Sequence, residues 1–266
     1  TITAYDYVSA QNADAVNIPL VLVGDSAAMV VYGMENTIPI SMDELIFLVR
    51  SVCRGTKNAL VVADMPFMSY QASVEDAVRN AGRFIKAGMD CAKVEGAMIN
   101  RVKAICESGI MVMSHLGLTP HTRAKLGGYR VQGKTAKSAE IILDQALRLQ
   151  DAGCSFLLLE AMPTEPAGMI AEKLSIPVYG IGAGDQVDGQ LVILHDLVGL
   201  FWDFKSKFVK RYCEAGQLIE SALLEYKEDV KDKKFPAKEN FYEINEDELE
   251  KLLGDSAWKY EKDRVE

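Results

Sequence analysis

The chain has 266 residues, 49% of them hydrophobic, and a formal net charge of −9. That length suits one large α/β barrel or two smaller domains. The negative charge argues against a nucleic-acid or anionic-membrane partner. No apolar run approaches the roughly 20 residues of a membrane span, and no signal peptide is visible. Five scattered cysteines without a CxxC pair favour reduced packing residues of a cytoplasmic-type protein over disulfides.

The first half of the chain alternates between apolar runs and amphipathic segments. We expect strands at 2–6, 19–26, 59–64 and 91–95. A helix follows each of them, at 9–16, 41–55, 73–88 and 98–108. Ser41 with Glu44, and Ser73 with Asp76, have the spacing of helix N-caps. The strands are apolar and largely uninterrupted, which is typical of a buried parallel sheet.

The second half continues the alternation after one long interruption. We expect a strand at 110–115, an irregular segment at 116–134, a helix at 135–153, a strand at 156–160, a helix at 165–174 and strands at 177–182 and 191–195. A loop as long as 116–134 in a compact domain is usually functional or disordered. Eight strand candidates with helices between most of them predict an α/β fold, a (β/α)8 TIM barrel. A doubly wound open sheet is the alternative.

The composition changes near Glu225. Residues 225–266 hold 14 acidic and nine basic residues and few apolar ones, so they carry five of the nine excess negative charges. We therefore expect a barrel with its C-terminal helix over 1–224, and an acidic, helical, largely solvated appendage over 225–266.

Five of the expected strands end on an ionisable residue. These residues are Asp25, Asp64, Glu95, His115 and Glu160. In a barrel, the C-terminal ends of the strands form the active site, so the five predict a ring of polar groups there. A single acid after a strand can instead open a turn or cap a helix.

The acids at the first two of these strand ends suggest a metal site. Asp25 and Asp64 lie on neighbouring strands, and oxygen ligands without sulfur or imidazole favour Mg²⁺ over Zn²⁺; two helix N-caps are the alternative. Strand alternation places Lys93 and Glu95 on one face, pointing into the barrel. Such a pair must be matched internally or bind something. An internal ion pair that merely fills the barrel is the alternative to a binding role.

Glu160 is the candidate general base. It follows three leucines, and apolar surroundings favour the uptake of a proton by a carboxylate; a turn or N-cap role is the alternative. His115 and His195 each close an apolar run, and either can be a hydrogen-bonded core histidine, which we favour for His195. Three histidines spread along the chain do not make a zinc site.

Eight ordered segments between residue 1 and about residue 212 resemble ketopantoate hydroxymethyltransferase (3-methyl-2-oxobutanoate hydroxymethyltransferase). They are 3–7 (TAYDY), 23–26 (VGDS), 63–67 (ADMPF), 93–96 (KVEG), 115–120 (HLGLTP), 127–133 (GGYRVQG), 180–184 (GIGAG) and 188–190 (DGQ). The resemblance implies a barrel of the phosphoenolpyruvate/pyruvate type, Mg²⁺ dependence, a homo-oligomer and a step in pantothenate synthesis. Ser114 and Ala161 depart from the usual glycine and cysteine, but neither stands at a metal or base position.

The resemblance also implies roles for individual residues. Asp25 and Asp64 match the metal-coordinating aspartates, and Glu95 matches an acid associated with the metal. Ser26 and Lys93 match groups that hold the keto acid, and the two metal aspartates help to hold it. His115 would contact these groups without touching the keto acid itself. Glu160 matches the proton acceptor.

The implied reaction joins a keto acid to a one-carbon unit. The carbonyl of 3-methyl-2-oxobutanoate would be polarised by Mg²⁺, Glu160 would remove the C3 proton, and the enolate would attack the one-carbon unit of 5,10-methylenetetrahydrofolate to give 2-dehydropantoate. A metal-dependent C–C or P–C lyase or mutase on the same barrel is the first rival. A barrel kept only as a binding or structural subunit is the second.

Overall fold

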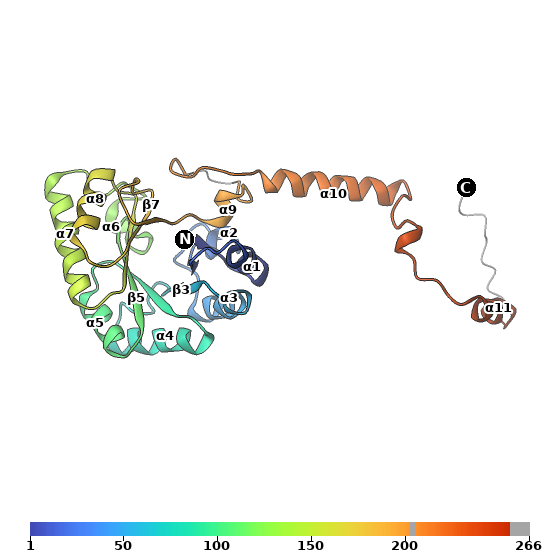
Figure 1. The fold of residues 1–266 in the computed structure, drawn as a ribbon, viewed down its shortest axis with the longest axis horizontal. Helices are drawn as coiled ribbons and strands as arrows, with labels where there is room; N and C mark the ends of the chain where they lie inside the picture. Colours follow the sequence, from blue (N-terminus) through green and yellow to red (C-terminus); the bar gives the residue numbers. More distant parts are fainter. Residues whose placement is uncertain (203–205, 256–266) are drawn as a thin grey trace. The chain divides into compact units, whose positions relative to one another are not determined.

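The computed structural model describes residues 1–202 and 206–255, and its first compact unit, Thr1–Glu214, is built around one eight-stranded sheet (Figure 1). All neighbouring strands are parallel and follow one another in sequence order. The strands are β1 (Ile2–Thr3), β2 (Leu20–Val23), β3 (Leu60–Asp64), β4 (Cys91–Glu95), β5 (Met111–Gly117), β6 (Phe156–Glu160), β7 (Val178–Ile181) and β8 (Gly189–Gln190).

Helices connect the strands and surround them. They are α1 (Tyr7–Ala15), α2 (Ala27–Val30), α3 (Met42–Gly55), α4 (Val74–Ala87), α5 (Ile99–Glu107), α6 (Arg123–Leu126), α7 (Ala136–Asp151), α8 (Thr164–Lys173) and α9 (Leu194–Leu197). Figure 1 shows α3, α4, α5, α7 and α8 outside the strands. The edges of the sheet meet where Ile2 bridges Val192 in parallel and the Thr3 N–H donates to the Val192 carbonyl at 3.1 Å. The expected (β/α)8 barrel is therefore confirmed, and the open-sheet alternative is wrong.

Strand alternation divides the buried side chains into two cores. Side chains such as Val61, Ala92 and Val94 point outward and pack against the helices. Side chains such as Leu22, Val62 and Cys91 point inward and join a smaller cluster within the barrel. The inward set fills the lower part of the barrel with apolar groups, and the last inward residue of several strands lies above it.

Local signals set the helix ends. Ser41 accepts a hydrogen bond from the Glu44 N–H, and the Glu44 carboxylate accepts one from the Ser41 N–H, so the pair forms a capping box. Ser73 caps α4 at the expected position, and α4 ends at Gly88, whose φ of 107° suits glycine. These caps fix where each chain segment re-enters the sheet.

Two expectations from the sequence are corrected. The last strand is Gly189–Gln190 rather than 191–195, because pairing with Tyr179 and Gly180 fixes its register and the chain then turns into α9. The 116–134 segment is not wholly irregular, since it contains a 3₁₀ turn η1 at Pro120–Thr122 followed by α6. That turn brings part of the segment back over the strand ends.

The second compact unit is Ala215–Glu266, of which the structure describes residues up to 255. It holds α10 (Ala215–Lys231), a 3₁₀ turn η2 (Lys238–Asn240) and α11 (Glu246–Asp255). Most of its described side chains are exposed. The unit thus begins ten residues before the composition changes, and the expected boundary at 224/225 stays a prediction. Within residues 1–202 and 206–255, no helix combines the length and the apolar character needed to cross a membrane.

Candidate active site

A layer of charged side chains lies at the C-terminal ends of the central strands. It stands above the apolar interior cluster because its members continue the inward-facing positions of β3, β4, β5 and β6. Strand pairing sets Asp64 beside Lys93, and Glu95 beside His115. Except for Glu160, which is partly exposed, the members are buried: Asp64, Lys93, Glu95 and His115. Their burial requires that each charge find a partner.

Lys93 and Asp64 form an ion pair, with Nζ and Oδ1 2.6 Å apart. Burial lowers the pKa of the Lys93 amine, but the carboxylates of Asp64, Glu95 and Asp25 outweigh burial and raise it. The amine therefore stays protonated at neutral pH. The Asp25 backbone N–H donates to the second oxygen of Asp64 at 2.9 Å, so this aspartate is held from two sides.

His115 lies between two carboxylates. Its Nε2 is 3.2 Å from Glu160 Oε2, and its Nδ1 is 3.6 Å from Glu95 Oε1. Burial and the Lys93 charge lower the pKa of His115, but its contacts with Glu160 and Glu95 outweigh them and raise the pKa to about 9. The ring thus carries a positive charge at neutral pH and holds the Glu160 carboxylate in place.

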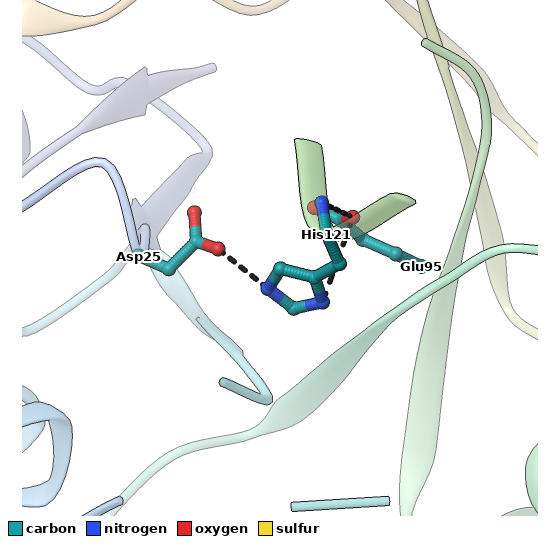
Figure 2. A group of neighbouring side chains, drawn as sticks. All are labelled: Asp25, Glu95 and His121. Carbon is teal, nitrogen blue, oxygen red and sulfur yellow. Dashed lines mark hydrogen bonds and ion pairs between the residues drawn. The ribbon is translucent and has the colours of Figure 1, made fainter. Parts of the chain in front are cut away.

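His121 completes the group, although it was not among the residues selected from the sequence. Its Nε2 is 2.8 Å from Asp25 Oδ2, its Nδ1 is 3.6 Å from Glu95 Oε2, and its backbone N–H donates to that oxygen at 3.0 Å. Figure 2 shows the ring between the two carboxylates. One ligand atom from each of Asp25, Glu95 and His121 lies within 4.8 Å of the others. Its one cue in the sequence is that it directly follows the 115–120 segment.

Two tyrosines contact residues of the site. The Tyr70 hydroxyl accepts from the Glu95 N–H at 3.2 Å and lies 3.1 Å from His121 Nδ1. The Tyr5 hydroxyl lies 2.8 Å from the Oγ of Ser26, the residue that follows Asp25 in the chain. Both tyrosine side chains are almost fully buried.

The expected ring of polar groups is largely present as one cluster. The structure links Asp25, Asp64, Lys93 and Glu95 by direct contacts, and Glu160 joins through His115. Among the residues that the structure describes, Asp25, Glu95 and His121 form the group suited to hold a metal ion, whereas Asp64 pairs with Lys93. His195 is outside this group: it lies in α9 and packs against the Tyr5 ring at 5.4 Å.

Comparison with known proteins gives the family. The model of the ketopantoate hydroxymethyltransferase family matches residues 1–238. A 3-methyl-2-oxobutanoate hydroxymethyltransferase from Syntrophobacter fumaroxidans is 46% identical over 95% of this chain and 91% of its own length. One from Nitrosopumilus maritimus is 46% identical over 94% and 91%. The match therefore spans most of both chains.

Solved structures share the fold at low sequence identity. A phosphoenolpyruvate phosphomutase from Streptomyces platensis subsp. rosaceus gives a TM-score of 0.57 at 14% identity, covering 95% of this chain and 89% of that one. A phosphonopyruvate hydrolase in complex with oxalate and Mg²⁺ gives 0.58 at 11% identity, covering 96% and 89%. This likeness supports the barrel type and no more.

Proposed function

Because this chain belongs to the ketopantoate hydroxymethyltransferase family, we propose that it transfers a hydroxymethyl group to 3-methyl-2-oxobutanoate, forming 2-dehydropantoate for pantothenate synthesis. The donor in this proposal is 5,10-methylenetetrahydrofolate. The family match disfavours the C–C or P–C lyase or mutase alternative, which shares only the fold.

The observation that carries the proposal is the charged layer itself. The layer contains a buried ammonium, two carboxylates that face a common point and a carboxylate held by an imidazolium. These are the groups needed to bind an anionic keto acid and to remove a proton beside its carbonyl. A barrel retained only for binding would have no need for so many buried charges, each of which is costly to desolvate.

The donor set suits a divalent cation. Asp25 and Glu95 bring buried carboxylate oxygens close together, and hard oxygen ligands favour Mg²⁺. We propose that Asp25, Asp64 and Glu95 hold Mg²⁺ directly or through water. Asp64 would either give up its ion pair with Lys93 or keep it while also holding the ion. When bound, the ion would supply Lewis-acid polarisation of the keto carbonyl.

Each side chain of the site has a separate role in the proposed reaction. Glu160 accepts the proton from C3 of the keto acid, and His115 orients its carboxylate through the 3.2 Å contact. Lys93 places a positive charge near the developing enolate oxygen, where it is most effective because water is excluded. Ser26, held by Tyr5, helps to position the substrate carboxylate.

The proposed reaction consumes one water molecule, which balances its atoms. C3 loses a proton and forms a bond to the methylene carbon of the folate, whose bonds to the folate nitrogens break. Water supplies the oxygen of the new hydroxymethyl group, and tetrahydrofolate leaves. The described part of the 116–134 segment lies over the strand ends through η1, where it could exclude bulk water.

The direct test is turnover with defined reactants. Purified protein, 3-methyl-2-oxobutanoate, 5,10-methylenetetrahydrofolate and Mg²⁺ should yield 2-dehydropantoate and tetrahydrofolate in equal amounts, detected by mass spectrometry. Omission of the folate should abolish product. Cleavage of the keto acid without folate would instead support the lyase alternative. A cytoplasmic location and a homo-oligomer also belong to this proposal.

A further inference from the structure

We propose that His121 is a nitrogen ligand of the metal site, so that this chain binds Co²⁺ and Zn²⁺ more tightly than Mg²⁺. The inference rests on the proposed function for the place of the site and deepens it by naming the preferred ions. It starts from one geometric fact: an imidazole lies between the two carboxylates that face each other at the strand ends (Figure 2).

The spacing of the donor atoms fits two neighbouring ligands of one ion. Ligand atoms that bind an ion at about 2.1 Å and at right angles lie about 3 Å apart. The distance from His121 Nε2 to Asp25 Oδ2 is 2.8 Å, and Glu95 lies within the same group. An ion bound to both atoms therefore requires little movement of the side chains.

The other ring nitrogen already has a suitable partner. A metal-binding imidazole donates its second N–H to a neighbouring acceptor, which fixes the tautomer. His121 Nδ1 lies 3.1 Å from the Tyr70 hydroxyl, which accepts from the Glu95 N–H and has the Glu95 carbonyl at 3.3 Å. If Nδ1–H donates to it, the Tyr70 hydroxyl accepts hydrogen bonds from His121 and from the Glu95 N–H and donates one to the Glu95 carbonyl. All the hydrogen bonds that this hydroxyl can make are then formed.

The ring is also held in position from its backbone. The His121 N–H donates to Glu95 Oε2 at 3.0 Å, and the ring packs edge-on against Phe67 with centroids 5.8 Å apart. The 3₁₀ turn at Pro120–Thr122 presents the residue from outside the sheet. A contact thus holds the backbone, the second nitrogen and the ring of His121, which is the preorganisation expected of a ligand.

The donor chemistry sets the ion preference. Carboxylate oxygens suit Mg²⁺, whereas imidazole nitrogen suits Zn²⁺ and neighbouring transition metals, and a site of given ligands binds Co²⁺ and Zn²⁺ more tightly than Mn²⁺. An imidazole added to Asp25 and Glu95 therefore strengthens transition-metal binding much more than Mg²⁺ binding. Mg²⁺ can still bind through the carboxylates alone.

The test measures metal binding without substrate. Calorimetry on the full-length metal-free chain should show a lower Kd for Co²⁺ and Zn²⁺ than for Mg²⁺. His121→Gln replaces the nitrogen donor by an amide, and we expect it to weaken Co²⁺ and Zn²⁺ binding by about a hundredfold, since even second-shell partners contribute about 10–100-fold. Its Mg²⁺ affinity should change by less than about threefold. His195→Gln, a histidine outside the site, is the matched control.

Two further readouts decide the matter if His121→Gln does not fold. Tyr70→Phe should lower Co²⁺ affinity about tenfold, because the Nδ1–H loses its acceptor. Wild-type protein labelled with ¹⁵N-histidine should show nitrogen coupling to bound Mn²⁺ by electron spin-echo spectroscopy. Equal Co²⁺-to-Mg²⁺ affinity ratios in wild type and His121→Gln, or no nitrogen coupling, would overturn the inference. Loss of turnover with every metal would count against the proposed function instead, since these binding measurements need no reaction.

Discussion

Glu160 has a proposed task that can be separated from carbon transfer. Its carboxylate is held by His115 and is partly open to solvent, unlike the other charged groups of the layer. Glu160→Gln keeps the size and a hydrogen-bonding group but cannot accept a proton. With Mg²⁺ and keto acid but no folate, we expect exchange of the C3 proton with solvent deuterium, followed by NMR, to fall about 10²–10⁴-fold, and turnover with it.

Binding of the keto acid by the Glu160→Gln variant should persist, because Asp25, Asp64 and Lys93 are unchanged. Glu172→Gln, an exposed glutamate on α8, is the control and should match the wild type. Exchange by the Glu160→Gln variant at the wild-type rate would show that the base is another residue, with Glu95 or His115 next to test. If the wild type does not exchange without folate, single-turnover kinetics replaces the exchange assay.

The raised pKa of His115 predicts that the stability of the metal-free protein depends on pH. Its pKa is about 9 in the folded chain and about 6.5 in an unfolded one. The folded state therefore binds the proton more tightly, and the resulting stabilisation is fully present below about pH 6.5 and is lost as the pH rises through about 9. We expect the free energy of unfolding, measured by denaturant titration in EDTA, to fall by on the order of 3 kcal/mol across that window.

The matched variant for the pH prediction is His115→Gln. It should be less stable than the wild type at pH 6 and should lose less stability on going to pH 9. Some slope will remain, because the contacts of His121 with Asp25 and Glu95 outweigh its burial and raise its pKa as well. An unchanged slope in His115→Gln would contradict the prediction.

At the scale of elements, the close approach of β5 and β6 positions Glu160. Gly117 pairs with Glu160, has a φ of 89°, and a Cβ added to it would lie 2.3 Å from the Glu160 carbonyl oxygen. Gly117→Ala must therefore push the two strand ends apart. We expect kcat to fall at least about tenfold, which corresponds to about 1.4 kcal/mol in the barrier, together with a loss of stability.

Gly109 provides the control for the Gly117 prediction. It has a similar φ of 85°, but a Cβ added there meets nothing within 4 Å. Gly109→Ala therefore carries the cost of left-handed backbone without the clash. Stability should fall in both variants, while kcat per folded molecule should fall only in Gly117→Ala. Equal kcat in the two variants would show that the Gly117 contact does not position the base.

The sequence predicts the elements whose signals are local. Caps such as Ser41 and strand alternation at 91–95 depend on neighbouring residues, so these elements fall where they were expected. The meeting of the acids follows from one rule, that parallel strands end at the same face. His121 was missed because its position depends on a 3₁₀ turn that folds a loop back over the strand ends. The place of β8 depends on pairing with Tyr179, which no local pattern reveals.

At the scale of the whole molecule, every side chain of the charged layer belongs to the unit Thr1–Glu214. The described part of Ala215–Glu266 consists mainly of α10 and α11, with few buried residues. Exposed apolar side chains on α10 include Leu218, Leu223 and Tyr226. Because these side chains are exposed, they add little to the stability of the unit unless another surface covers them.

Truncation after Lys234 tests this division and keeps α10 intact. We expect kcat and kcat/KM per folded molecule to stay within about threefold of the full chain, because every side chain named in the charged layer lies within Thr1–Glu214. Circular dichroism would establish that the barrel is folded, and light scattering would report the subunit number of both proteins. A loss of more than about tenfold in kcat, about 1.4 kcal/mol in the barrier, with fold and subunit number unchanged, would show that residues 235–266 serve the active site. A loss that accompanies a smaller assembly would instead place their role in holding subunits together.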